Sequence, residues 1–124
     1  MEIGDNSFAN FQSFELSNLN SIPSIKFGNN CFKNVREFVL DGLESLKSVK
    51  IGISCFRIDD KERDDGICRI MNCPNLTQLE IGDHGFKDFQ SFELSNLNSI
   101  QSIKYGNDCL KNGTNKFSSS NQNP

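Results

Sequence analysis

Cysteine is the first residue type in this 124-residue chain whose number and spacing could support chemistry. There are five cysteines, an odd number, so at least one of them lacks a disulfide partner within the chain. Cys31, Cys55 and Cys109 share one slot of a repeating pattern, and two other copies of that slot hold Ser7 and Gly85. Because neighbouring strands lie about 4.8 Å apart, adjacent cysteines in this slot could form a disulfide. A zinc site would need four converging ligands, which the pattern does not supply. We therefore expect reduced thiols in an apolar row, with no metal and no cofactor.

The single histidine, His84, is the only side chain whose unperturbed pKa would suit general acid–base catalysis near neutral pH. A catalytic site also requires a nucleophile and an orienting group in the same place, and the pattern around His84 supplies neither. His84 occupies a turn position of the repeat, where we expect it to bond to backbone. We therefore predict no enzymatic activity.

Two further patterns could bind calcium or carry a glycan. The charged stretch 57–66 places Asp60, Glu62 and Asp64 at alternate positions, as a calcium loop does. Asp65 and Met71 stand where that loop requires glycine and glutamate, so we expect a solvated loop. The sequons that begin at Asn75 and at residue 112 matter only in a secreted protein, and the first flanks a core leucine that would limit its accessibility.

Composition narrows the class of partner. The net charge is −3, which gives no electrostatic reason to expect nucleic acid or an acidic membrane surface. No apolar run approaches the roughly 18–20 residues that span a bilayer, and the first residues resemble no signal peptide. Free cysteines and this lack of a signal favour an intracellular protein. A cell-surface location stays open if the chain is a fragment of a longer array.

An internal repeat organises the chain. The segment FQSFELSNLNSI occurs at residues 11–22 and again, unchanged, at 89–100, which is an offset of 78 residues. A shorter period lies within it and divides the chain into unit 1 (1–24), unit 2 (25–48), unit 3 (49–78), unit 4 (79–102) and unit 5 (103–113). The offset equals the length of units 1 to 3, so a cassette of three units is duplicated. We expect one domain over 1–113 and a disordered, Asn- and Ser-rich tail over 114–124.

Each unit contains two apolar frames. The first has apolar residues spaced by three and then two positions, which does not fit an amphipathic helix but does fit a short strand. It stands as Ile22, Ile25 and Phe27; Leu46, Val49 and Ile51; Leu76, Leu79 and Ile81; and Ile100, Ile103 and Tyr105. The second frame alternates and is rich in Phe, which favours another short strand. It stands as Phe11, Phe14, Leu16 and Leu19; Val35, Phe38, Leu40 and Leu43; and Phe89, Phe92, Leu94 and Leu97, with Cys68, Ile70 and Cys73 as core replacements in unit 3.

The first frame, L-x-x-L-x-I, resembles the leucine-rich-repeat superfamily over residues 1–110. Within that superfamily, the elements IGDNSF at 3–8, FGNNCF at 27–32, IGISCF at 51–56 and IGDHGF at 81–86 look like BspA-like repeats of microbial and protist proteins. The segment CPNLTQLEI at 73–81 looks like the cysteine-containing leucine-rich repeats. The resemblance implies a β-rich solenoid of about five coils, with short strands on both faces and little helix. It also implies protein recognition or adhesion without catalysis, and an asparagine ladder at the turn positions held by Asn6, Asn30, Ser54, His84 and Asp108.

The outward positions of the first strands are the candidate protein-binding face. Alternation predicts a row of small polar residues beside a row of long charged ones. The face consists of Ser24, Lys26, Ser48, Lys50, Gln78, Glu80, Ser102 and Lys104, with Glu2 at the start of the charged row. The opposite face is predicted to be mostly acidic, with Glu15, Glu37 and Glu93 beside Arg69. A merely solvated surface explains these residues equally well. A second hypothesis is a structural or adhesive element that associates end to end through uncapped units.

Overall fold

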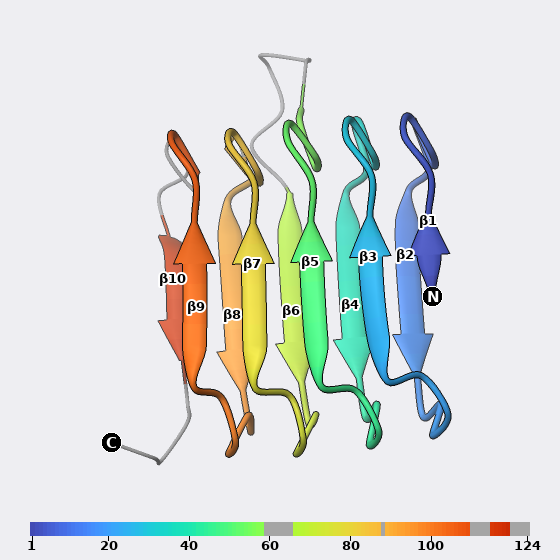
Figure 1. The fold of residues 1–124 in the computed structure, drawn as a ribbon. Helices are drawn as coiled ribbons and strands as arrows, with labels where there is room; N and C mark the ends of the chain where they lie inside the picture. Colours follow the sequence, from blue (N-terminus) through green and yellow to red (C-terminus); the bar gives the residue numbers. More distant parts are fainter. Residues whose placement is uncertain (59–65, 88, 110–114, 120–124) are drawn as a thin grey trace.

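The computed structural model describes residues 1–58, 66–87, 89–109 and 115–119, and these residues form two parallel five-stranded sheets (Figure 1). Sheet A contains, in spatial order, β1 (Glu2–Ile3), β3 (Ser24–Phe27), β5 (Ser48–Ile51), β7 (Gln78–Ile81) and β9 (Ser102–Tyr105). Sheet B contains β2 (Ser13–Ser17), β4 (Glu37–Asp41), β6 (Ile67–Met71), β8 (Ser91–Ser95) and β10 (Asn115–Ser119). The described residues include no helix, and therefore none that could cross a membrane.

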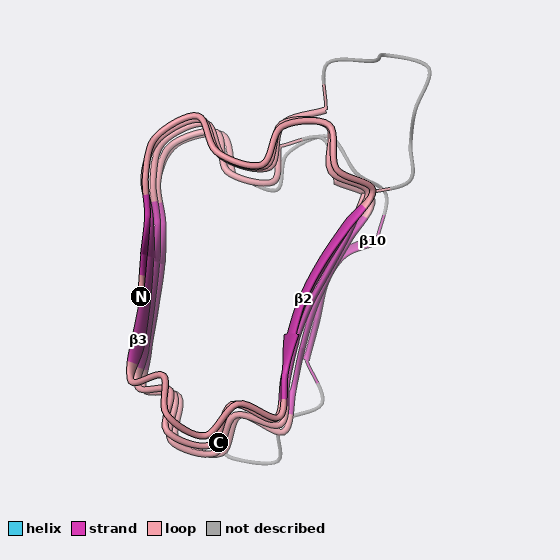
Figure 2. Cartoon of the chain, turned by 90° about the vertical axis from the view of Figure 1, so that its right-hand side faces the viewer, coloured by secondary structure: helices cyan, strands magenta, loops and turns pink. Residues whose placement is uncertain are grey.

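Successive strands alternate between the two sheets, so each repeat unit contributes one strand to sheet A and one to sheet B. The strands of one sheet all run the same way, and those of the other sheet run the opposite way (Figure 1). In the view along the stack, successive units superpose and the two sheets lie on opposite sides (Figure 2). The prediction of a β-rich repeat stack with short strands on two faces is confirmed.

The register of sheet A follows the repeat. Ile25 pairs with Val49, which pairs with Leu79, and all three side chains are buried. Their burial confirms the inward orientation predicted for this frame. Alternation places the intervening residues outward, so the apolar frame determines which face each polar residue occupies.

A column of phenylalanine rings fills the core between the sheets. Phe8, Phe32, Phe56 and Phe86 stack ring on ring, with centroid distances of 5.2, 4.7 and 4.2 Å along the column. All four have positive φ, between 53° and 61°, a conformation that residues other than glycine rarely adopt. The stack holds them there through backbone hydrogen bonds between units, such as Phe32 N–H to the Ser7 carbonyl at 2.8 Å. The rings therefore couple neighbouring units.

The last strand lies within the predicted tail, 114–124. β10 (Asn115–Ser119) pairs in parallel with β8. Its register is irregular between Asn115 and Phe117. The physical reason is that the open edge of β8 presents unpaired backbone groups, which can bind a segment that lacks the repeat pattern. Residues 114 and 120–124 lie outside the described part of the chain. So do Asp60, Glu62 and Asp64, the residues of the calcium alternative.

Candidate functional site

The outward face of sheet A brings all the predicted face residues together. Cross-strand pairing aligns Ser24, Ser48, Gln78 and Ser102 in one row. The neighbouring row contains Glu2, Lys26, Lys50, Glu80 and Lys104. Ser48 and Ser102 are half-buried and the other residues of both rows are exposed. We call these two rows the sheet A face. It is a flat polar surface whose side chains repeat at the strand spacing of about 4.8 Å.

The charges on the sheet A face have an uneven order. Lys26 and Lys50 are direct neighbours, and an acidic residue flanks this pair on each side, Glu2 before it and Glu80 after it. In the residues that the structure describes, no lysine of this row forms a salt bridge within 4.0 Å. Two adjacent like charges destabilise a parallel pair slightly, so an external carboxylate between them would be favourable.

The outward face of sheet B contains Glu15, Glu37, Arg69 and Glu93 in two rows. Glu15 pairs with Val39, and Glu37 pairs with Ser13 in the preceding row. The middle row therefore contains Glu15, Val39, Arg69 and Glu93. Arg69 contacts Glu93, with Nε 3.7 Å from Oε1. The outward positions of β2, β4, β6 and β8 are a mixture of acidic residues and serines, with Arg69 and the apolar residues Val39, Ile67 and Met71 among them.

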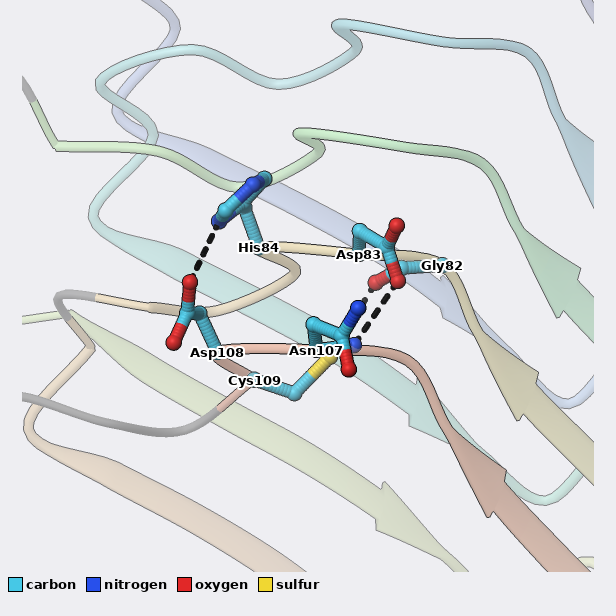
Figure 3. Close-up of polar contacts among 6 residues, drawn as sticks. All are labelled: Gly82, Asp83, His84, Asn107, Asp108 and Cys109. Atoms are coloured by element: carbon cyan, nitrogen blue, oxygen red, sulfur yellow. Dashed lines mark hydrogen bonds and ion pairs between the residues drawn. The ribbon is translucent and has the colours of Figure 1, made fainter.

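The turns after the sheet A strands contain the asparagine-type ladder, one residue earlier than predicted. Asp83 Oδ1 accepts the Asn107 N–H at 2.7 Å (Figure 3). Asp5 and Asn29 do the same for the N–H groups of Asn29 and Ile53, at 2.7 and 2.9 Å. The predicted positions have another role: Asn6, Asn30, Ser54, His84 and Asp108 all have positive φ. The first four of these donate their backbone N–H to a carbonyl of the next unit. The spacing of the repeat alone could not show which of two consecutive polar residues in the turn accepts the ladder hydrogen bond.

His84 is a turn residue, as predicted. Its backbone N–H donates to the Asn107 carbonyl at 2.8 Å, and its Nδ1 lies 3.5 Å from Asp108 Oδ2 (Figure 3). Both side chains are solvent-accessible and lie on a turn. The pair has the geometry of a surface ion pair when the imidazole is protonated, which contributes little to stability.

The three cysteines in the shared slot point into the stack and donate to backbone. Each Sγ lies 3.1 Å from a glycine carbonyl oxygen in the preceding unit: Cys31 to Gly4, Cys55 to Gly28 and Cys109 to Gly82. The last of these contacts is drawn in Figure 3. The row is therefore a second ladder, of S–H groups, parallel to the carboxylate and amide ladder. All five cysteines are unpaired in the structure.

Burial makes the thiols of Cys55, Cys68, Cys73 and Cys109 poor nucleophiles. It raises the pKa of Cys55 to about 12 and raises the pKa of Cys68 well above its ordinary value. Burial also raises the pKa of Cys73 and Cys109. The reactive form of cysteine is the thiolate, so such a shift disfavours both nucleophilic attack and metal binding. Cys68 pairs with Phe38 and is buried, which confirms its prediction as a core replacement. Cys73 is buried in the same way.

The remaining candidate sites are the first sequon and a metal site. Asn75, the first sequon residue, is exposed, which corrects the expectation of poor access. The reason is that the turn directs Asn75 outward while Leu76 points inward, and its Nδ2 donates to the Glu44 carbonyl at 2.6 Å. Over the described ranges, no group of three His, Cys, Asp or Glu side chains is arranged to hold a metal ion.

Comparison with known proteins adds no relative. No family model, no curated protein and no solved structure matches this chain.

Proposed function

We propose that this chain is a non-enzymatic protein-binding module, a leucine-rich-repeat type of solenoid whose sheet A face contacts the partner. The observation that supports this most directly is the alignment of Ser24, Ser48, Gln78 and Ser102 beside a continuous charged row. A flat array of exposed side chains on a repetitive backbone suits extended contact with another protein. The repeating L-x-x-L-x-I frame and the turn ladder support the assignment to this repeat class.

The adjacent lysines indicate the chemistry of the partner. A carboxylate of the partner between Lys26 and Lys50 would relieve their repulsion. Glu2 and Glu80 would repel further carboxylates on either side of this pair, so the acidic stretch of the partner would be short. Each contact at such an exposed site is worth only about 0–1 kcal/mol. The charges would therefore orient the partner and speed its association, while the polar row and bridging water supply further contacts.

A matched pair of variants tests this function. The double substitution Lys26→Glu and Lys50→Glu reverses the charge of the sheet A face, and Glu15→Lys with Glu93→Lys does the same on sheet B. Proteins captured from the source cell by the unmodified chain should be retained by the sheet B variant and lost by the sheet A variant. Affinity and salt dependence that are equal for all three proteins would exclude the sheet A face.

A second candidate is a structural or adhesive element that assembles end to end. It is favoured by the exposed apolar residues of unit 1, with Phe11 53% and Leu19 42% exposed, beside the open strand edges of β1 and β2. Glu2 at one edge of sheet A and Lys104 at the other carry opposite charges. A contact between different surfaces of identical chains leads to closed rings, or to open filaments where the rotation does not close. Sedimentation velocity separates the candidates: a monomer at all concentrations favours the module, and concentration-dependent growth favours assembly.

A further inference from the structure

A shallow groove lies at the turns that follow the sheet B strands, away from the sheet A face. Its volume is about 460 Å³, a size that suits a small ligand. Four successive units contribute two lining residues each, so the groove runs along the stack. Most of its lining is asparagine: Asn18, Asn20, Asn72, Asn96 and Asn98.

The backbone accounts for this composition. The residue after each of β2, β4, β6 and β8 has positive φ: Asn18, Gly42, Asn72 and Asn96. Asparagine and glycine are the residues that best tolerate that conformation. The first three donate their backbone N–H to a carbonyl of the next unit, at 2.9 to 3.1 Å. The stack thus satisfies these backbone donors, and the side-chain amides are left to line the groove.

The amides are held in a fixed direction. Asn72 Nδ2 donates to Asp41 Oδ1, and Asn96 Nδ2 donates to Asn72 Oδ1, both at 2.8 Å. An asparagine side chain has two N–H donors and two acceptor lone pairs. This ladder uses one donor and one lone pair of Asn72, so its amide can still give and accept one hydrogen bond each. A hydroxyl group, which both donates and accepts, matches that pattern.

Charge and spacing narrow the class of ligand. Glu44 is the one charged side chain of the lining, and the lack of a cation there disfavours phosphate. Asparagine amides line the groove in units 1, 3 and 4, and neighbouring units lie about 4.8 Å apart, whereas alternate residues of an extended peptide repeat at about 6.6 Å. Successive pyranose rings of an extended, equatorially linked glycan advance by close to the strand spacing, and each ring is turned over relative to the one before it. One ring can therefore face each unit, whereas the same-face residues of a peptide do not match the spacing of the units.

We propose that this groove binds a neutral, extended oligosaccharide that lies along the stack, with one sugar ring for each repeat unit. Pro74 supplies an apolar surface for a ring face. The Asn18 amide packs against Gly42, because a Cβ there would lie 2.7 Å from Asn18 Oδ1. This site is independent of the sheet A face, so either proposal can fail while the other holds.

The test is a titration of the full chain with cellohexaose and with chitohexaose, followed by NMR of the asparagine side-chain amides. We expect shift changes in the groove amides and none on the sheet A face. Asn72→Gly removes one amide from a turn that Gly42 already shows is compatible with glycine, and it should weaken binding about tenfold, or about 1.4 kcal/mol. The matched control, Asn34→Gly, changes another positive-φ asparagine with a ladder bond, to Asn10 at 3.1 Å, outside the groove. It should leave affinity unchanged.

Gly42→Asn gives a second test that does not remove a ladder bond. Asparagine occupies the same turn position in three other units, so the backbone of the turn should persist. The new Cβ would lie 2.7 Å from Asn18 Oδ1, so the Asn18 amide must shift and the added side chain enters the groove. Binding should be lost. The proposal is overturned if neither oligosaccharide shifts the groove amides at millimolar concentration, or if Asn72→Gly binds as well as the unmodified chain. Equal binding of a neutral Gly-Ser peptide in the groove would also overturn it.

Discussion

Residues 11–22 and 89–100 have the same sequence and the same strand, yet they lie in different surroundings. β2 (Ser13–Ser17) is at the edge of sheet B with a neighbour on one side, whereas β8 (Ser91–Ser95) lies between β6 and β10. Phe11 is 53% exposed and its counterpart Phe89 is 0% exposed. Leu19 is 42% exposed and Leu97 is 0% exposed. The local sequence thus determines the strand, and the neighbouring units determine its burial.

The difference is energetic as well as geometric. Burying an apolar side chain of this size stabilises the fold by about 1.5–3 kcal/mol. Phe14 and Leu16 are half-buried, and Phe92 and Leu94 at the same positions of the interior copy are buried. Identical residues should therefore contribute differently to the free energy of unfolding, and substitution at matched positions measures how much each neighbour contributes.

The largest effect is expected at the matched phenylalanines. Phe89→Ala should lower the free energy of unfolding by about 3–5 kcal/mol, because Phe89 packs against the rings of Phe56 and Phe86 at 5.9 and 5.2 Å. Phe11→Ala should cost well under half of that, since much of its ring is already in water. Urea unfolding of both variants is the measurement. Equal losses would mean that the unit 1 edge is covered in solution.

The second effect compares a central strand of sheet A with its edge. Leu79 and Ile103 are cross-strand partners, and Leu79 is buried while Ile103 is half-buried. Leu79→Ala should cost about 2–5 kcal/mol, which includes the cavity that it leaves. Ile103→Ala should cost less. The same denaturant titration checks this, and a larger loss at Ile103 would contradict the order of burial.

The third prediction compares the alkylation rates of two cysteines that occupy the same position of the repeat but differ in solvent exposure. Cys55 is buried and Cys109 is half-buried, so Cys109 should be alkylated first in the native protein at pH 8. All five thiols should react after unfolding under non-reducing conditions, and fewer than five would contradict the prediction of reduced cysteines. Quantitative mass spectrometry of the alkylated sites gives both results.

The raised pKa of Cys55 leads us to expect that the free energy of unfolding depends on pH. The folded-state pKa of Cys55 is raised to about 12, above the ordinary value of 9.0. The folded state therefore binds this proton more tightly than the unfolded state. The contribution is fully present below pH 9 and is lost as the pH rises toward 12. Chemical unfolding across this range should show a steeper loss for the parent chain than for Cys55→Ala. Identical slopes would contradict the assigned cause.

The smallest effect concerns the surface charges. Lys50→Gln removes both the repulsion from Lys26 and the attraction to Glu80, so it should change the free energy of unfolding by less than about 1 kcal/mol. Glu80→Gln removes an opposite charge beside both Lys50 and Lys104, so it should lower the free energy of unfolding, also by less than about 1 kcal/mol. Thermal unfolding at low and at high salt checks this pair. A large loss in either variant would show that the sheet A face serves stability.

Much of the fold could be predicted from the sequence because the pattern repeats. Apolar frames in four units identified the inward residues of both sheets, and the rows of the sheet A face followed from alternation. The ladder position was misplaced because the predicted residue and the one that accepts the hydrogen bond are consecutive polar residues of the same turn. The groove was not foreseen, since its lining comes from four turns that only the stack brings together. The strand at Asn115–Ser119 depends on a free sheet edge, which its own composition does not reveal.

Amide hydrogen exchange of the unmodified chain, resolved by NMR, measures most directly how neighbouring units order the two copies of the repeated segment. The repeated segment has the same intrinsic exchange rates in both copies, because its sequence is the same. We expect the amides of β8 to exchange at least about tenfold more slowly than those of β2, since opening an interior strand breaks contacts on both sides. Equal protection of the two copies would contradict the claim that neighbouring units, and not local sequence, determine order in this protein.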